Sequence, residues 1–162
     1  MQRLYERFAG YAMAAGLRYV PDHEEVRDVM QDSFVKILTS LEHFTYRGEG
    51  SLKAWVKSIV VHQALDHVKA HERMILTDHI PEEPEEEQPD VGHIPPDVLT
   101  ELIGQLPTGY RMVLNLYVFE QFSHKEIARL LGIKPESSAS QYLRAKRALA
   151  KLINEYLNNG TL

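Results

Sequence analysis

The chain has 162 residues and no cysteine, which excludes disulfides, cysteine-ligated zinc, iron–sulfur clusters and thiol nucleophiles. No apolar run approaches the roughly 18 residues of a membrane span, and the first residues lack the apolar core of a signal peptide. We therefore expect a soluble, cytoplasmic protein without a membrane segment. Its net charge of -5 by itself argues against an acidic partner such as nucleic acid.

The acidic charge is concentrated in one short segment. Residues 1–75 hold ten Lys+Arg and ten Asp+Glu. Residues 76–97 hold eight Asp+Glu and no Lys or Arg, and residues 98–162 hold eight Lys+Arg and five Asp+Glu. The acidic segment also carries five of the eight prolines, a composition that favours an extended linker, although an ordinary solvated loop is the alternative. We expect an acidic, Pro-rich linker over residues 76–96 between two small domains, residues 1–75 and 97–162.

The first domain has the apolar periodicity of helices. One helical stretch is expected over residues 3–19, and a second follows over residues 22–41, where Asp22 is the expected N-cap. Two glycines end the second helix, and a third periodic run covers residues 51–73. No window alternates with period two, so we expect an all-α fold.

The second domain has a sharper pattern. Ser123 and Glu126 have the spacing of a capping box, which marks the start of a helix. Gly132 ends this helix at a position that often needs a left-handed residue, and the small Ala128 allows a second helix to approach closely. This spacing is typical of a helix-turn-helix, whose second helix enters the major groove of DNA.

That second helix has one apolar and one basic face when it is projected at about 100° per residue. Tyr142, Ala145 and Leu149 lie on the apolar face. A solvated helix packed on one side would show the same amphipathicity, but the nearby capping box and glycine turn favour DNA recognition. The residues predicted to approach base edges are Ser137, Ser140, Gln141 and Arg144, and those predicted to contact phosphates are Arg147 and Lys151.

An acidic stripe lies on the helix expected over residues 22–41. Glu24, Asp28 and Asp32 are spaced four residues apart and share one face, with Gln31 nearby. The stripe suits a basic partner surface, although a solvated charged face would have the same pattern. A general acid/base pair is disfavoured because no nucleophile accompanies the carboxylates, and no other catalytic set indicates an enzyme.

Aromatic and basic residues are interleaved between residues 44 and 73. Aromatic rings stack on unpaired bases and cations follow the phosphate backbone, so this segment suits a protein that holds melted DNA. Tyr46, in a loop with glycines, is the expected base contact, whereas Trp55 is expected in the core. The residues predicted to contact this DNA are Tyr46, Arg47, Lys53, Lys57, His62, Lys69 and Arg73.

His67 and His71 are four residues apart, a spacing that can bind zinc from one helix face. A zinc site needs a third ligand, and no second cluster supplies one. We therefore predict no metal and no cofactor.

Two sets of motifs resemble a single family. The helix-turn-helix, preceded by LPTGYRMVLNLYVFEQFS, resembles region four of extracytoplasmic function (ECF) RNA polymerase sigma factors, which recognises the minus-thirty-five promoter element. The stretch EEVRDVMQDSFVKIL resembles the polymerase-binding helix of sigma region two, and FTYRGEGSLKAWVKSIVVHQALDHVK resembles the segment that melts and reads the minus-ten element. The resemblance covers nearly the whole chain in the order of the family.

The resemblance implies a sigma factor that binds RNA polymerase core and promoter DNA and directs transcription initiation, and it allows for an anti-sigma factor as a further partner. Asp28, Gln31, Asp32 and Phe34 occupy the positions at which the family docks on the clamp helices of the polymerase. His62 departs from the family, which often has Asn there to contact the minus-ten element. The linker glutamates are expected to occupy basic polymerase channels until the transcript displaces them: Glu82, Glu83, Glu85, Glu86 and Glu87.

The alternative is a stand-alone helix-turn-helix repressor or activator. Such a protein usually needs a dimer interface and enough positive charge to bind DNA alone. The DNA-reading domain has eight Lys+Arg against five Asp+Glu over residues 98–162, which is a small excess.

Overall fold

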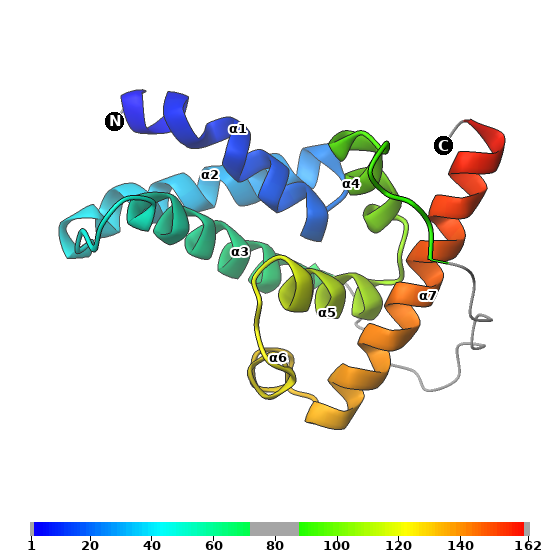
Figure 1. The fold of residues 1–162 in the computed structure, drawn as a ribbon. Coiled ribbons are helices and arrows are strands. Elements are labelled where there is room, and N and C mark those ends of the chain that lie inside the picture. Colours follow the sequence, from blue (N-terminus) through cyan, green and yellow to red (C-terminus); the bar gives the residue numbers. More distant parts are fainter. Residues whose placement is uncertain (1, 72–87, 161–162) are drawn as a thin grey trace. The chain divides into compact units, whose positions relative to one another are not determined.

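The computed structural model describes residues 2–71 and 88–160 of two compact units, Met1–Glu72 and Arg73–Leu162 (Figure 1). Every regular element within the described residues is a helix, which confirms the predicted all-α fold for this part of the chain. Arg73 and the five linker glutamates lie outside the described residues. None of the described helices is both long enough and apolar enough to span a membrane.

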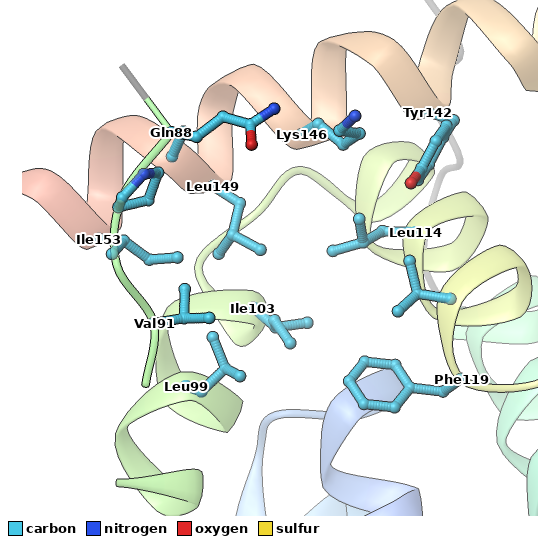
Figure 2. Close-up of a pocket in the computed structure, with 13 residues that line it drawn as sticks. Gln88, Val91, Leu99, Ile103, Leu114, Phe119, Tyr142, Lys146, Leu149 and Ile153 are labelled. Carbon is cyan, nitrogen blue, oxygen red and sulfur yellow. The ribbon is translucent and has the colours of Figure 1, made fainter. Parts of the chain in front are cut away.

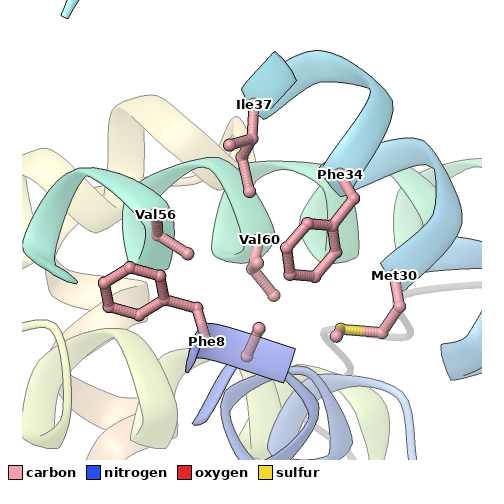
Figure 3. Packing of buried hydrophobic residues seen from close by; sticks show 7 residues of the cluster. Phe8, Met30, Phe34, Ile37, Val56 and Val60 are labelled. Atoms are coloured by element: carbon pink, nitrogen blue, oxygen red, sulfur yellow. The ribbon is translucent and has the colours of Figure 1, made fainter. Parts of the chain in front are cut away.

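The N-terminal unit is built from three helices that all contact one another. These are α1 (Gln2–Tyr19), α2 (His23–Ser40) and α3 (Ser51–His71), and a short 3-10 turn, Leu41–His43, follows α2 (Figure 1). Figure 3 shows the side chains that meet between them. The buried cluster consists of Phe8 and Ala12 from α1, Met30, Phe34 and Ile37 from α2, and Val56 and Val60 from α3.

Asp22 caps the start of α2. The carboxylate of Asp22 caps α2 by accepting hydrogen bonds from the N–H groups of Glu24 and Glu25, at 2.9 and 3.0 Å. The bond from Glu25, and to a smaller extent the bond from Glu24, lowers the pKa of Asp22 below its ordinary value.

Gly16 of α1 lies where α1 and α2 pack together. A Cβ added to Gly16 would lie 3.0 Å from Cγ2 of the buried Val26. The glycine therefore allows the two helices to approach closely.

In the C-terminal unit one long helix contacts each of the other three. These are α4 (Pro96–Gly104), α5 (Thr108–Val118) and α6 (His124–Leu131), and the long helix is α7 (Pro135–Asn159). Prolines occupy the N-caps of α4 and α5, where a missing N–H costs no helical hydrogen bond. Two buried clusters draw on α4, α5, α7 and the segments beside α4: Ile94, Leu102, Ile103, Leu106, Tyr110, Leu114, Ala145 and Ile153. The buried residues of α6 are Ile127, Ala128 and Leu131.

The described part of the predicted linker, residues 88–96, includes one side chain that packs on the C-terminal unit. Ile94 exposes only 9% of its surface and packs with Leu102 and Ile153. An apolar side chain among prolines and acidic residues gains stability by burial against α4 and α7. Ile94 therefore anchors this segment to the C-terminal unit, whereas most of its neighbours between residues 88 and 96 are exposed.

An apolar pocket of about 380 Å³ lies next to this segment (Figure 2). Its wall is apolar except at the rim, where Tyr142 and Lys146 of α7 and Gln88 lie. Burial, and to a smaller extent the neighbouring Tyr117, raises the pKa of the Tyr142 phenol. The other lining residues are Pro89, Val91, Leu99, Ile103, Leu114, Val118, Phe119, Leu149, Ala150 and Ile153.

Candidate nucleic-acid interface

The predicted helix-turn-helix is present as α6, a three-residue turn and α7. The Ser123 hydroxyl accepts a hydrogen bond from the N–H of Glu126 at 3.2 Å, and the Glu126 carboxylate accepts one from the N–H of Ser123 at 2.8 Å. Gly132 ends α6 with a φ of 69°, and its N–H donates to the carbonyl of Ala128. The capping box and the left-handed glycine are both confirmed, and they define where α6 starts and where the chain turns into α7.

Most of the residues predicted to contact DNA from α7 have accessible side chains. Ser140 is exposed, whereas Ser137, Arg144, Arg147 and Lys151 are half-buried. They lie within the first five turns of α7. A helix-turn-helix uses this part of its second helix to contact base edges and phosphates.

The prediction that Gln141 lies on this exposed face is wrong, because its side chain is only 2% exposed. The buried residues of α7 are Ser138, Gln141, Ala145 and Ile153, so the buried face extends one turn further toward the start of the helix than the apolar residues indicate. Burial here follows the packing of α7 against α5 and α6, and the polar character of a glutamine does not prevent it. Gln141 is therefore not positioned to reach a base edge.

Sequence reasoning missed Leu143, which exposes 48% of its surface on the outer face of α7. It lies three residues after Ser140 and seven after Glu136, both of which are exposed, and Lys146 extends the same face by a further turn. This helical spacing from exposed residues is the sequence signal that could have predicted an exposed Leu143.

In the N-terminal unit the loop before α3 has a defined shape. The N–H of Arg47 donates to the Ser51 hydroxyl at 3.2 Å, and that hydroxyl donates to the carbonyl of Gly48 at 2.7 Å. Gly48 and Gly50 have φ values of 112° and 82°, which favour glycine. Tyr46, at 70% exposure, projects from this loop into solvent, as a base-stacking residue must.

Trp55 packs where the sequence placed it, against the core. Its ring lies 5.1 Å from that of Phe44, and it contacts the buried cluster of the N-terminal unit. The ring therefore closes the base of the loop that carries Tyr46.

The cations of α3 do not form a single track. Lys53 is exposed, with its Nζ 4.4 Å above the ring of Tyr11, and the half-buried Lys57 follows one turn later. His62 lies nine residues after Lys53, which is about 180° around a helix. Lys69 is exposed on the same side as His62. Among the predicted residues that the structure describes, Tyr46, Arg47, Lys53 and Lys57 therefore lie near the start of α3, and His62 and Lys69 lie on another side of the helix.

The histidine pair has a structural partner. The Nε2 of His67 donates to the carboxylate of Glu25 at 3.2 Å and so links α3 to α2, while its ring stacks on that of His71 at 4.2 Å. Among the residues that the structure describes, no three His, Asp or Glu side chains are placed to hold a metal ion.

Three of the four residues predicted to bind polymerase line one groove. Asp28, Gln31 and Phe34 lie along a groove of about 540 Å³ between α1 and α2. Phe34 is only 7% exposed and belongs to the core, so it forms the floor of the groove rather than a projecting contact. Asp32 is exposed but lies outside the groove lining.

The sequence also missed two exposed apolar residues at this groove. Tyr5 and Val35 line it and expose 54% and 58% of their surfaces. Asp28 of the acidic stripe and the basic Arg27 also line it, so the groove combines apolar contact with charges of both signs. Such a surface fits a partner that offers apolar side chains together with charged groups.

A capped helix, a left-handed glycine and a second helix with an exposed polar and basic face define a helix-turn-helix protein. The protein-family comparison agrees and is more specific: sigma-70 region 2 matches residues 4–74, and sigma-70 region 4 matches residues 97–149. The chain therefore belongs to the sigma-70 family as an ECF-type sigma factor, a protein that directs transcription initiation by RNA polymerase.

Curated relatives cover most of the chain. The RNA polymerase sigma-H factor of Pseudomonas aeruginosa is 26% identical over 87% of this chain and 79% of its own length. The ECF RNA polymerase sigma factor SigM of Bacillus subtilis is 22% identical over 98% of both chains. The ECF RNA polymerase sigma-E factor of Haemophilus influenzae is 29% identical over 86% of this chain and 80% of its own. Matches to two sigma regions in one chain do not favour the stand-alone repressor or activator.

Proposed function

We propose that this chain is the promoter-recognition subunit of an RNA polymerase holoenzyme and makes three kinds of contact. The groove between α1 and α2 binds the polymerase core, Tyr46 and the start of α3 hold the melted minus-ten strand, and α7 binds the minus-thirty-five element. The observation that carries this proposal is the outer face of α7, which directly follows the capped α6 and the turn at Gly132. Its curated relatives are named as sigma factors of RNA polymerase, which supports polymerase core and promoter DNA as partners.

The protein performs recognition and strand opening, and bond formation remains with the polymerase. We propose that it is not an enzyme and that it acts in the cytoplasm, where bacterial transcription takes place. We also propose the functional division predicted from the sequence: residues 1–75 for core binding and the minus-ten element, 76–96 as linker, and 97–162 for the minus-thirty-five element.

Run-off transcription tests this function. Purified chain is added to core polymerase on a duplex that the holoenzyme has selected from a randomised pool. We expect a discrete transcript that requires both proteins, and comigration of the chain with core on a sizing column. No promoter-specific transcript together with no comigration would contradict the sigma assignment, and tight duplex binding by the chain alone at physiological salt would favour a repressor.

Variants of the groove and of α7 separate the proposed contacts. Val35→Asp adds a charge to the exposed apolar edge of the groove, so we expect weaker binding to core. Arg144→Ala removes a cation from α7, so we expect normal core binding and weaker binding of the selected duplex. Equal effects of both variants on both measurements would show that the two surfaces do not have separate roles.

An anti-sigma factor is a further partner that we propose for this chain. The apolar pocket of the C-terminal unit supports it, because Val91 and Val118 line the pocket and expose 51% and 45% of their surfaces. Coexpression with the product of the neighbouring gene tests the idea. We expect the coexpressed protein to copurify with this chain and to lower run-off transcription. The Val118→Asp variant should restore transcription. Transcription that is unchanged by the coexpressed protein would reject that protein as the regulator.

A further inference from the structure

Three helices of the helix-turn-helix domain meet at the side chain of His124. Its Nδ1 lies 2.8 Å from Oγ of Ser138, so the first residue of α6 shares a hydrogen bond with the second turn of α7. Its ring stacks on Tyr117 of α5, with centroids 4.6 Å apart and planes 10° from parallel. Tyr142 of α7 lies 4.3 Å from Tyr117 and 6.0 Å from His124. One imidazole therefore contacts α5 and α7 from the start of α6.

Ser138 depends on this hydrogen bond because its side chain is fully buried. A buried hydroxyl without a partner loses the hydrogen bonds that water would provide, which destabilises the folded state. The stacked ring cannot move toward or away from α7 without losing its contact with Tyr117. The bond therefore holds Ser138 at one place relative to α5 and α6.

The position of Ser138 determines which side chains of α7 face outward. Its neighbours Ser137 and Ser140 belong to the surface proposed to contact DNA, and α6 and α7, which pack against each other, are connected by a short turn that contains Gly132. A helix with side chains has a radius of about 5–6 Å, so a rotation of α7 by roughly 20° would move a side-chain tip by about 2 Å. Such a displacement breaks a hydrogen bond to a base edge.

We propose that His124 and Ser138 form a positioning pair, which fixes the rotation of α7 about its own axis and thereby sets the base preference of the protein. The inference rests on the proposed function, since it concerns how α7 meets the promoter. His124 itself contacts no DNA in this proposal. It acts through Ser138 on the outer residues of α7.

The test compares two duplexes that bind the holoenzyme. One is the duplex selected by the wild-type holoenzyme from a randomised pool, and the other has its upstream element scrambled. Because base contacts carry specificity and phosphate contacts do not, the ratio of the two affinities measures the alignment of α7. For Ser138→Ala and His124→Phe, we expect this ratio to fall about fivefold or more, the size of one lost base contact, with core binding unchanged. The Phe variant keeps an aromatic ring against Tyr117 and removes the nitrogen.

Two further variants separate positioning from stability. His124→Asn places an amide where Nδ1 lies, so it should restore part of the ratio that His124→Phe loses. Ser33→Ala removes another fully buried hydroxyl, which donates to the carbonyl of Val29 at 2.6 Å in the N-terminal unit. This control should lower the melting temperature and leave the ratio unchanged.

The outcomes distinguish this inference from the proposed function. If Ser138→Ala and His124→Phe lower the melting temperature but keep the wild-type ratio, the pair is only structural and the inference is overturned. If His124→Asn behaves like His124→Phe in a folded protein, the hydrogen bond is not what positions α7, which also overturns it. If the wild-type holoenzyme does not distinguish the two duplexes, the proposed promoter recognition fails, and the inference fails with it.

Discussion

Leu143 gives the outer face of α7 an apolar contact, with 48% of its surface exposed among polar and basic neighbours. A leucine cannot hydrogen-bond to a base, but it can contact the C5-methyl group of thymine in the major groove. We expect replacement of thymine by uracil at one position of the selected duplex to weaken holoenzyme binding a few-fold. In Leu143→Ala this sensitivity to the methyl group should disappear. A variant that keeps the full preference for thymine would show that Leu143 is not the contact.

Gly16 and Gly10 form a matched pair on α1. A Cβ at Gly16 would lie 3.0 Å from Val26 and 3.8 Å from Val60, whereas a Cβ at Gly10 has no neighbour within 4 Å. Alanine in a helix is favoured over glycine by up to about 1 kcal/mol. We expect Gly10→Ala to raise the free energy of unfolding by about that amount and Gly16→Ala to lower it by about 1–3 kcal/mol through overpacking. Denaturant unfolding measures both, and equal changes would mean that α2 can move away at no cost.

The exposed face of α7, which we propose contacts DNA, could be predicted from the sequence only where the polarity of a residue matches its burial. Ser140 is exposed as expected, since nothing in the packing of α7 requires a serine there. Gln141 and Leu143 lie on the faces opposite to those that their polarity predicts. The orientation of α7 depends on contacts with α5 and α6 that are distant in sequence, and no projection of a single helix contains them.

Among the helices, α2 has the clearest dependence on pH. Hydrogen bonds from its first turn lower the pKa of Asp22 from 3.8, so the ionised carboxylate is the form that stabilises the folded state. This contribution is present above the unfolded pKa and is lost as the pH falls through the lower, folded pKa. We expect the difference in melting temperature between wild type and Asp22→Ala to shrink as the pH is lowered below 3.8.

Asp22→Asn is the control for this prediction. Its amide oxygen can still cap the helix but carries no titrating charge, so its difference from Asp22→Ala should not change with pH. A constant difference between wild type and Asp22→Ala across the same range would contradict the role of ionised Asp22.

Element boundaries were the most predictable level of the fold. The cap at Asp22, the capping box at Ser123 and the glycine at Gly132 are local signals, and each lies at the helix end that it predicts. The grouping of cations on α3 was less predictable. Lys53 and His62 belong to one segment in sequence, but nine residues of helix place them on opposite sides.

At the scale of the whole chain, the five linker glutamates account for the entire net charge of -5. If they occupy basic channels of the polymerase, as the family resemblance implies, neutralising all five to Gln should weaken that interaction. We expect the variant to change the ratio of abortive to full-length transcripts in run-off assays and to keep its affinity for core. Unchanged transcript lengths would reject this role.

The long helix α7 contributes to the core on one side and faces solvent on the other, and this division limits how promoter choice can diverge. A substitution at Ala139, Ser140 or Leu143 changes the surface proposed to meet DNA and leaves the packing intact, because all three side chains are exposed. A substitution at the fully buried Ala145 changes the packing of α7 before it changes recognition. Descendants of this gene can therefore acquire new regulons one outward residue at a time, and an engineer who wants an orthogonal variant should randomise those outward positions first.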